Sequence, residues 1–422
     1  MRRNDQPLLF CFIVIGIVFA GIAFHLVLRL EKEIVKSKAF IQIDVQVGDM
    51  SPAAWPHPII HVINTRFQQE QAHLSALGRA RLVLFETFCL NSIVGQTVLH
   101  DKKGIPFLWI IKVDPMLDEM LLREILLLVN AYEFIFVVAS NVNFGVGQRA
   151  GGWRGGEAGN DVLKSLVYTG NLTLLNQAYL DRGNKIVLET RVDADDGLHV
   201  DYVRNIQIKT LRYLQLLPNQ TDDRRQRWLY FCSLRHIDWN PHPRDSKNGK
   251  SDYFGLFLPK KSPHVCITAG ISVGLSVGVQ EHQVPRFSHF DLARELRKTG
   301  PKTKIDCGCG SGGKCLRLLS TPTWGAIRSR TPTSAGMRDI LIEPANFEKR
   351  LAVAITRNIT MLTRELWQDF RCDYEQVIKA QSYLQDHLLE IVTENLQGQC
   401  TRGHSCKNSS KEILKALMET KK

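Results

Sequence analysis

Short apolar runs of strand length alternate with longer stretches of helical periodicity in the first half of the chain. The runs occupy residues 59–64, 107–113, 134–139 and 186–188, and the helical patterns occupy residues 70–93, 120–128 and 199–217. This alternation predicts an α/β fold, in which helices cover both faces of a parallel or mostly parallel sheet. Ligands bind such sheets beyond the carboxyl ends of the strands, so residues that directly follow a run are candidates for a functional site.

The end of the chain follows a different pattern. Between residues 347 and 396, apolar residues recur at steps of three and four, which predicts a series of helices. The steps do not keep a strict heptad. We therefore expect these helices to pack against the domain rather than to form a coiled coil with a partner.

The chain begins with an apolar segment. Residues 8–24 carry no charge, and the apolar stretch continues to Leu28, which gives about the 20 residues that a membrane-spanning helix needs. A cleaved signal peptide would have a shorter apolar region that ends in small residues. We expect a short cytoplasmic tail and transmembrane anchor in residues 1–30, a stem in residues 31–58, an α/β domain in residues 59–345 and a C-terminal helical extension in residues 346–422.

Charge does not fix the orientation of this anchor, because basic residues lie on both sides of it. Four N-glycosylation sequons begin at Asn171, Asn219, Asn358 and Asn408. Together with the short tail and several cysteines, they favour a single-pass type II membrane protein. Its folded part would then lie in the lumen of the secretory pathway, and we expect it at the Golgi membrane.

Cysteine spacing leaves two interpretations open. Cys307, Cys309 and Cys315 could be three ligands of a zinc ion, or they could contribute to a disulfide in an oxidising compartment. Cys400 and Cys406 would be a second candidate pair. Ten cysteines minus Cys11 in the anchor leaves an odd number, so at least one is free or bonded to another chain.

The formal net charge is +12, and the basic residues are scattered along the chain rather than gathered in one arm. This balance suits an anionic ligand such as a nucleotide diphosphate as well as it suits nucleic acid. Our expectation for the partner is a nucleotide diphosphate sugar and no nucleic acid. Hydrophobic residues make up 44% of the chain and charged residues 23%, which excludes wholesale disorder and a polytopic membrane protein.

An acidic cluster follows the run that begins at residue 186. It consists of Asp193, Asp195 and Asp196, directly after Arg191. If Asp193 and Asp195 remain extended, both point to the same side at the ligand edge of the sheet. Two carboxylates there can hold one Mn²⁺ or Mg²⁺ together with phosphate oxygens of a substrate. The metal would neutralise a departing diphosphate.

Other interpretations of the cluster exist. Aspartates are favoured just before a helix, so the cluster could instead cap the helix expected at residues 199–217. A calcium-binding loop is excluded, because its sixth position would be Leu198 instead of glycine and its twelfth Arg204 instead of glutamate.

Several blocks of the chain resemble the rhamnosyltransferase family of glycosyltransferases. They begin at His61, Arg81, Phe107, Thr190, Pro263 and Arg328, and the most specific is Thr190-Arg191-Val192-Asp193-Ala194-Asp195-Asp196. The resemblance covers about residues 59–340 and implies a GT-A-like nucleotide-binding α/β/α sandwich with a DxD metal site. The chain departs from bacterial members in its anchor, in a cysteine- and glycine-rich insertion near residue 310 and in its long C-terminal helices.

The resemblance also implies a role for each acidic residue of the specific block. Asp193 and Asp195 would bind Mn²⁺ or Mg²⁺, and Asp196 would support them or touch the sugar. His289 is our candidate for the third metal ligand that GT-A enzymes often supply from a later loop. The alternative for His289 is an ordinary packed histidine.

Matching blocks further suggest which residues face the nucleotide. They are Arg66, Asp114 and Arg191, with a structural ion pair as the alternative for each arginine. An inverting transfer also needs a base that accepts the proton of the acceptor hydroxyl. Asp238 is our candidate, because its neighbour Trp239 offers an aromatic ring on which a sugar could stack; a surface turn is the alternative.

We therefore expect a glycosyltransferase that moves a sugar from a nucleotide diphosphate sugar donor to a hydroxyl of a glycan or glycoprotein acceptor. A membrane-anchored carbohydrate-binding protein without catalysis is one alternative. A methyltransferase is another, because residues 305–312 resemble the first motif of enzymes that use S-adenosylmethionine, although residues 302–304 make a poor strand end.

Glycine-rich stretches elsewhere do not complete a known motif. Residues 145–159 fail the GxGxxG pattern and suit a flexible loop that closes over the donor. Residues 308–315 fail the phosphate-binding loop pattern, because Cys315 stands where a magnesium-binding serine or threonine belongs.

Overall fold

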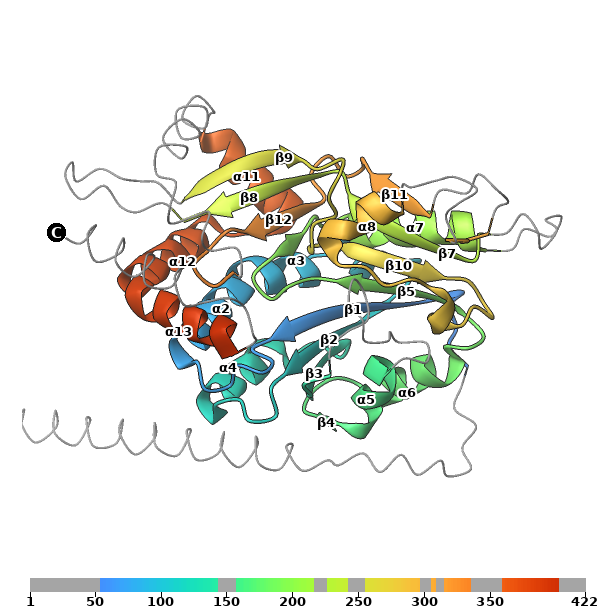
Figure 1. The fold of residues 1–422 in the computed structure, drawn as a ribbon, viewed down its shortest axis with the longest axis horizontal. Helices are drawn as coiled ribbons and strands as arrows, with labels where there is room; N and C mark the ends of the chain where they lie inside the picture. Colours follow the sequence, from blue (N-terminus) through green and yellow to red (C-terminus); the bar gives the residue numbers. More distant parts are fainter. Residues whose placement is uncertain are drawn as a thin grey trace, which may run out of the picture.

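Two β-sheets and the helices around them make up the fold (Figure 1). The computed structural model describes residues 54–142, 157–215, 226–241, 255–296, 305–308, 315–334 and 359–401. The strands of the large sheet are β1 (Ile59–Phe67), β2 (Phe107–Val113), β3 (Ile135–Ala139), β4 (Leu166–Val167), β5 (Ile186–Arg191), β7 (Trp228–Ser233), β10 (Ile271–Leu275) and β11 (Leu316–Leu319). Those of the small sheet are β6 (Gly197–Leu198), β8 (Arg235–Asn240), β9 (Leu256–Lys261) and β12 (Ala326–Ser329).

The large sheet has eight strands in the order β11-β7-β10-β5-β1-β2-β3-β4. Its centre is parallel, as the alternation of strands and helices predicts, since β5, β1, β2 and β3 all run in one direction. The expectation of a mostly parallel sheet is nevertheless wrong at its flanks. Strand β10 runs antiparallel to both β5 and β7, and β4 runs antiparallel to β3. An antiparallel neighbour does not need the crossover connection that a parallel neighbour requires, so the alternation of strands and helices does not predict these pairings.

Helices cover both faces of the large sheet. The main helices are α2 (Ser75–Leu84), α4 (Glu119–Val129), α5 (Glu157–Lys164), α6 (Leu172–Asp181), α7 (Tyr202–Leu214) and α8 (His289–Glu295). One face packs against α4 and α7 through residues such as Leu121 and Ile206. The other packs against α5 and α6 through Val162 and Leu175, and against α8 through Leu292. The α/β class with two covered faces is therefore confirmed.

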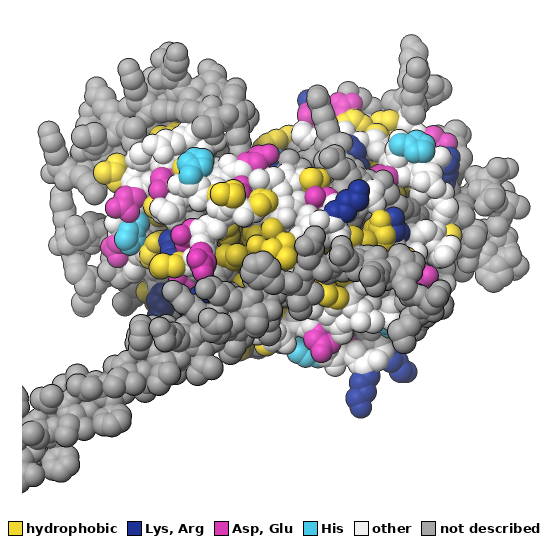
Figure 2. Space-filling view, turned by 90° about the horizontal axis from the view of Figure 1, so that it is seen from below, with side chains coloured by type: hydrophobic (Ala, Val, Ile, Leu, Met, Phe, Trp, Pro, Cys, Tyr) yellow, Lys and Arg dark blue, Asp and Glu magenta, His cyan; other side chains and the backbone are white. Residues whose placement is uncertain are grey.

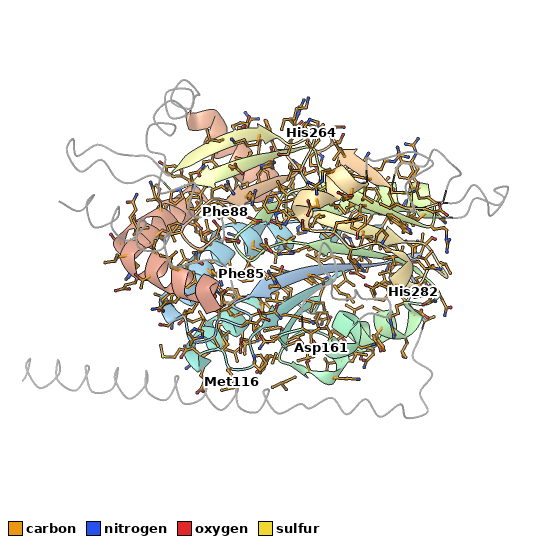
Figure 3. All side chains as sticks on the ribbon, viewed as in Figure 1. Phe85, Phe88, Met116, Asp161, His264 and His282 are labelled. Atoms are coloured by element: carbon orange, nitrogen blue, oxygen red, sulfur yellow. A yellow bond between two sulfur atoms is a disulfide. The ribbon has the colours of Figure 1, made fainter. Side chains whose placement is uncertain are left out.

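The helix expected over residues 70–93 is interrupted. It consists of α2, a π-helical stretch at Phe85–Leu90 and α3 (Asn91–Val94). The ring of Phe85 packs on Trp109 of the large sheet at 5.7 Å between centroids, whereas Phe88 packs on Trp239 of the small sheet at 4.8 Å (Figure 3). This one segment therefore joins two hydrophobic cores.

The C-terminal helices complete the second core. They are α11 (Ile359–Phe370), α12 (Tyr374–Asp386) and α13 (Leu388–Thr401), and the first part of the predicted extension lies outside the described residues. Phe370 and Val377 pack with Leu77 of α2 and with Trp239 of the small sheet. The prediction that these helices pack against the domain is confirmed.

The predicted anchor and stem lie outside the described residues. Within residues 54–401, as far as they are described, no helix is long and apolar enough to span a membrane. Of the four sequons, only Asn171 falls in the described part, where its side chain caps the start of α6.

Two methionines at the start of helix α4 are exposed. Met120 is 63% exposed, and Met116, which precedes the helix, is 81% exposed. Met116 lies at the lower edge of Figure 3, and Figure 2 shows hydrophobic side chains near the centre of the face seen from below.

Disulfides decide between the two interpretations of the cysteines. Cys307 is bonded to Cys315, so these two are not ligands of a zinc ion. Cys232 of β7 is bonded to Cys266, a pair that the spacing did not suggest. Cys309 and Cys406, and the side chain of Cys400, lie outside the described residues.

Candidate functional site

The acidic cluster lies at the carboxyl end of β5, at the ligand edge of the large sheet. We call residues 193–196 the acidic turn, because the N–H of Asp196 donates to the carbonyl of Asp193 at 3.0 Å. The expectation that Asp193 and Asp195 stay extended is wrong: strand pairing ends at Arg191, and the chain then folds back on itself. The three carboxylates therefore have different partners.

The negative charge of Asp193 is neutralised by a neighbouring arginine. Its Oδ1 accepts from Arg191 Nη2 at 2.8 Å and from Arg191 Nε at 3.1 Å. Burial raises the pKa of the carboxyl, but Arg191 and then Arg66 outweigh burial, and hydrogen bonds from Arg191 and Thr268 add to their effect. The net pKa of Asp193 lies well below its usual range, so this carboxylate is ionised.

Asp195 has weaker support. Its Oδ2 accepts from Thr333 Oγ1 at 3.2 Å, and its backbone carbonyl accepts from the Ser329 hydroxyl. Burial and the neighbouring charge of Asp193 raise the pKa of Asp195, against the opposing charge of Arg81. This carboxylate is held next to another negative charge, which a cation would relieve.

Asp196 is the most buried of the three, at 3% exposure. Its Oδ1 accepts from the backbone N–H of Ser329 at 2.9 Å, which attaches the acidic turn to β12 of the small sheet. Burial, then Asp195 and Asp193, raise the pKa of Asp196 well above its usual value, against Arg328. Three carboxylates thus lie close enough to shift one another.

The loop before β10 supports the acidic turn from one side. Gly270 donates its N–H to the carbonyl of Arg191 at 2.9 Å, and its carbonyl accepts from the hydroxyl of Tyr202. Gly270 has φ +79°, and a Cβ there would lie 2.8 Å from the Tyr202 hydroxyl oxygen. Only glycine fits this approach, which brings Thr268 within hydrogen-bonding reach of Asp193.

Cationic side chains from three adjacent strands share one face next to the turn. In the strand register, Asn64 of β1 is opposite Arg191, and Arg66 of β1 is opposite Lys112 of β2. Neighbours in register project to the same face, and alternate residues of a strand do too. Arg191, Arg66 and Lys112 therefore lie on the face that α5, α6 and α8 cover, at the carboxyl edge of the sheet.

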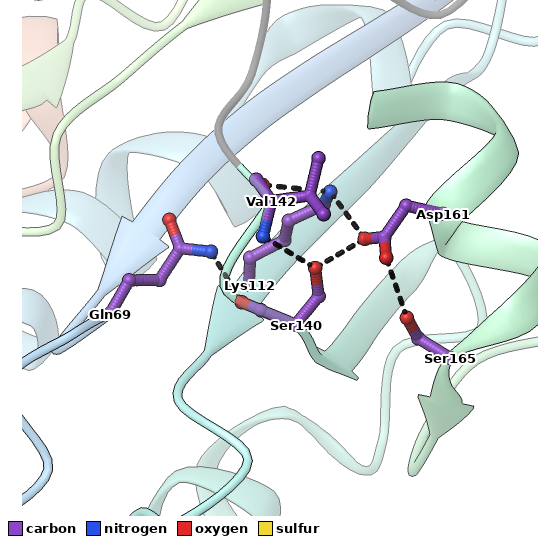
Figure 4. A network of polar contacts seen from close by, with 6 residues as sticks. All are labelled: Gln69, Lys112, Ser140, Val142, Asp161 and Ser165. Carbon is purple, nitrogen blue, oxygen red and sulfur yellow. Dashed lines mark hydrogen bonds and ion pairs between the residues drawn. The ribbon is translucent and has the colours of Figure 1, made fainter. Parts of the chain in front are cut away.

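Lys112 is the most enclosed member of this row, with a side chain that is 0% exposed. Its Nζ donates to Asp161 Oδ2 at 2.9 Å and to the Val142 carbonyl at 3.0 Å (Figure 4). The Ser140 hydroxyl also donates to Asp161, and Gln69 donates to the Ser140 carbonyl. The charge of Lys112 is therefore matched inside the protein.

His289 begins α8, near the acidic turn. Its Nε2 is buried and has no hydrogen-bond partner among the described residues. Burial, and then the charges of Arg191 and Arg328, lower the pKa of His289 to about 4, although Asp193 acts in the opposite direction. The imidazole is therefore neutral at pH 7 and can present a lone pair to a metal ion or accept a hydrogen bond.

Asp238 lies in strand β8, not in a surface turn, and is 9% exposed. His236 Nε2 contacts its Oδ1 at 3.2 Å. Burial raises the pKa of Asp238, but a hydrogen bond and charge from His236, followed by Arg330 and Arg328, produce a net lowering. Arg328 also lowers the pKa of Asp196 and of His289, so it lies near both the base candidate and the acidic turn.

Asp114 has a local structural role. Its carboxylate accepts from the backbone N–H of Glu70 and of Met116, each at 2.8 Å. It therefore stabilises the turn after β2 and ties it to the loop after β1. A contact with a nucleotide remains a prediction.

The side chains around the acidic turn include candidate ligands of a divalent cation. Among the described residues, no group of three or more His, Cys, Asp and Glu side chains is arranged to hold a metal ion. Mg²⁺ or Mn²⁺ is commonly held by only one or two carboxylates and takes its other ligands from substrate phosphate, a role that Asp193 and Asp195 could fill. Asp193 and Asp195 would hold such an ion, and His289 as a further ligand remains a prediction.

Several residues around the turn received no role from the sequence. Arg81 donates from Nη2 to the carbonyl of Thr333 at 3.3 Å, and Thr333 in turn holds Asp195. Thr268 and Arg328 act on Asp193 and Asp196. All four fall inside the blocks that carry the family resemblance, which was the signal that could have identified them.

A pocket of about 260 Å³ lies elsewhere in the described structure. Arg227, Trp228, His282, Gln283, Pro285, Ile305 and Asp306 line it. Ser276, just after β10, donates its N–H to the carbonyl of Arg227. Since β10 begins beside Arg191, this pocket lies at the opposite end of the strands from the acidic turn.

Comparison with known proteins assigns neither a family nor a function to this chain. A scan against models of protein families finds no match, and a search of curated proteins finds no similar sequence. Function is therefore inferred from the acidic turn and from the cations around it.

Proposed function

We propose that this protein is a glycosyltransferase of GT-A type that transfers a sugar from a nucleotide diphosphate donor to a hydroxyl of a glycan or glycoprotein. One observation carries the proposal. The carboxylates of the acidic turn and the cations Arg191 and Arg66 lie together at the carboxyl edge of a parallel sheet, where such sheets bind ligands.

The charges suit a diphosphate. Arginines present several donors in a fixed fork that matches phosphate oxygens, so Arg66 and Arg191 would bind the diphosphate on the face of β1 and β5. A bound Mn²⁺ or Mg²⁺ would neutralise the negative charge that develops on the leaving diphosphate. Asp193 and Asp195 would hold this ion, with His289 as a further ligand, and Asp196 would fix the turn to the small sheet.

Asp238 would serve as the base of an inverting transfer. The acceptor oxygen bonds to the anomeric carbon, the bond from that carbon to the diphosphate breaks, and the hydroxyl proton passes to the Asp238 carboxylate. His236 and two arginines lower the pKa of Asp238, which keeps it ionised and able to accept a proton. His236 would orient the carboxylate through its 3.2 Å contact.

The cysteines support a location in the secretory pathway. Disulfides Cys232–Cys266 and Cys307–Cys315 suit an oxidising compartment and would be unusual in the cytosol. We propose that an anchor in residues 1–30 holds the folded domain on the lumenal side of the Golgi membrane.

The variant Asp195→Asn tests the function, because it removes one negative charge and keeps the side-chain shape. Wild-type protein should melt at a higher temperature with one nucleotide diphosphate sugar of a panel, and Mn²⁺ should increase the effect. At about 100 times Kd, such binding adds about 2.7 kcal/mol to the unfolding free energy. Asp195→Asn should lose the Mn²⁺-dependent part and transfer sugar at least about 100-fold more slowly.

Asp386→Asn is the matched control, since Asp386 is exposed at the end of α12, and it should behave as wild type. Full transfer by Asp195→Asn, with unchanged dependence on Mn²⁺, would remove the proposal. Binding of glycans without any effect of nucleotide sugars would instead indicate a non-catalytic carbohydrate-binding protein.

A further inference from the structure

The two faces of the small sheet differ. Among the described residues, one face packs into a hydrophobic core along β8, β9 and β12, whereas the other does so only at Leu198 and Ala326, at the β6 edge. The strand order of this sheet is β6-β12-β8-β9, and the register places Arg328 of β12 opposite Asp238 of β8. On the other side of β8, Leu258 is opposite Asp238 and Lys260 is opposite His236. Residues opposite one another lie on the same face, so we call the face that carries these five side chains the basic face.

The reverse side of the sheet packs into a hydrophobic core at its centre. Ile237, Trp239, Phe257 and Ile327 point there and pack with helices α2, α11 and α12. By contrast, Arg328, Leu258 and Lys260 are half-buried. The basic face therefore offers polar and charged groups to a ligand, while the reverse side fixes the sheet in place.

Positive charge is in excess on this sheet. By alternation along the strands, Lys260, Arg328 and Arg330 project to the basic face, against Asp238 as the only acidic residue there, whereas Arg235 and Lys261 project to the reverse side. Within the described part of the chain, none of these three cations forms a salt bridge. Asp238 offsets only part of their charge, so an anionic ligand would be favoured there.

The basic face adjoins the acidic turn. Arg328 is followed by Ser329, whose N–H binds Asp196 and whose hydroxyl binds the Asp195 carbonyl. Adjacent strands are about 4.8 Å apart, so the path from Arg328 across β8 to Lys260 spans about 10 Å. That is the scale of a short oligosaccharide that starts at the acidic turn and passes Asp238.

We propose that the basic face binds the acceptor and that the acceptor is an acidic glycan carrying sulfate or carboxylate groups. The placement of the donor at the acidic turn rests on the proposed function. Nucleic acid is the less suitable partner, because among the described residues of this face there is no aromatic ring on which a base could stack; Trp239 and Phe257 point to the core.

Binding of defined hexasaccharides to the full chain, without donor, tests the proposal. The probes are a chondroitin sulfate hexasaccharide, a hyaluronan hexasaccharide, which has carboxylates alone, and uncharged chitohexaose. We expect the acidic probes to bind, with affinity that falls as salt concentration rises, and chitohexaose to bind at least tenfold more weakly. A preference between the two acidic probes would identify sulfate or carboxylate as the recognised group.

Lys260→Glu should weaken binding of the acidic probe about tenfold, because it reverses one charge on the basic face. Lys102→Glu makes the same change of net charge in an exposed loop and should leave binding unchanged. Equal binding of chitohexaose, an equal effect of the two variants, or tighter binding of a single-stranded oligonucleotide would each overturn the inference.

Thermal shift with nucleotide sugars separates this inference from the proposed function. Lys260→Glu should keep the wild-type response to the donor and to Mn²⁺, since it does not touch the acidic turn. A normal donor response without acidic glycan binding overturns the acceptor assignment alone. Acidic glycan binding without any donor response overturns the proposed function and, with it, the identification of the glycan as an acceptor.

Discussion

Two charged regions lie at the carboxyl edge of the large sheet, on either side of β1, and their charges are balanced differently. On β2, Lys112 is 0% exposed and contacts Asp161 inside a closed set of hydrogen bonds. After β5, the acidic turn carries three carboxylates, and among the described residues only Asp193 forms an ion pair with an arginine. Both regions occupy the edge where ligands bind such sheets.

The difference shows that position at this edge does not by itself indicate a functional site. In a buried ion pair each charge is neutralised by its partner, so the pair needs no ligand, and removal of one partner destabilises the fold. Like charges held together, as with Asp195 and Asp193, cost stability and are relieved by a cation. The comparison therefore predicts that disruption of the first region unfolds the protein, whereas disruption of the second abolishes function.

The largest effect is expected for Asp161→Ala. The variant removes the carboxylate that contacts the buried Lys112 ammonium, and loss of one partner of such a pair costs about 3–5 kcal/mol of unfolding free energy. Chemical denaturation measures it. Adding Lys112→Met to the variant should recover part of the loss, because the buried charge is then gone as well. A cost below about 1 kcal/mol would show that the pair is not structural.

A buried histidine with hydrogen-bond partners in the core predicts that pH changes the unfolding free energy by an intermediate amount. His61 lies within the core, with Nε2 at 2.8 Å from Thr190 Oγ1 and Nδ1 at 3.3 Å from Gln207 Nε2. Burial lowers its pKa to about 3 from 6.5. Between these values, only the unfolded state binds the proton, so the unfolding free energy falls by about 1.4 kcal/mol for each pH unit below 6.5.

At pH 5 this contribution is about 2 kcal/mol. His61→Gln should lack it, so its unfolding free energy should fall less steeply than that of wild type between pH 7 and pH 5. The slopes are compared rather than the absolute values, because the substitution also changes packing. Parallel slopes would contradict a neutral, buried His61.

The smallest effect on stability is expected for Asp195→Asn. The side chain is half-buried and keeps its bond from Thr333, and the variant removes repulsion from Asp193. We expect the unfolding free energy to change by less than about 1 kcal/mol, although transfer is lost. A loss as large as that of Asp161→Ala would place the acidic turn among the structural groups and end the contrast.

Much of the central sheet was predictable from the sequence, and much of its surroundings was not. The run at residues 107–113 is the observed β2, and β1, β3 and β5 were found with small errors at their ends. These strands are buried on both faces and each contains an apolar run, although β1 and β5 carry polar residues near their ends. Strands of the small sheet carry Arg, His and Asp on one face, and so they lack that signal.

The sequence by itself determined the α/β class, the helical C-terminus and the place of the acidic turn after β5, because these depend on periodicity and on neighbours along the chain. Only the tertiary structure decided that the turn folds back, that Ser329 and Thr333 hold it and that Arg328 lies near both it and Asp238. The bonds from Ser329 and Thr333 join residues more than 100 positions apart, and such pairings are selected by the packing of the two sheets and not by local sequence.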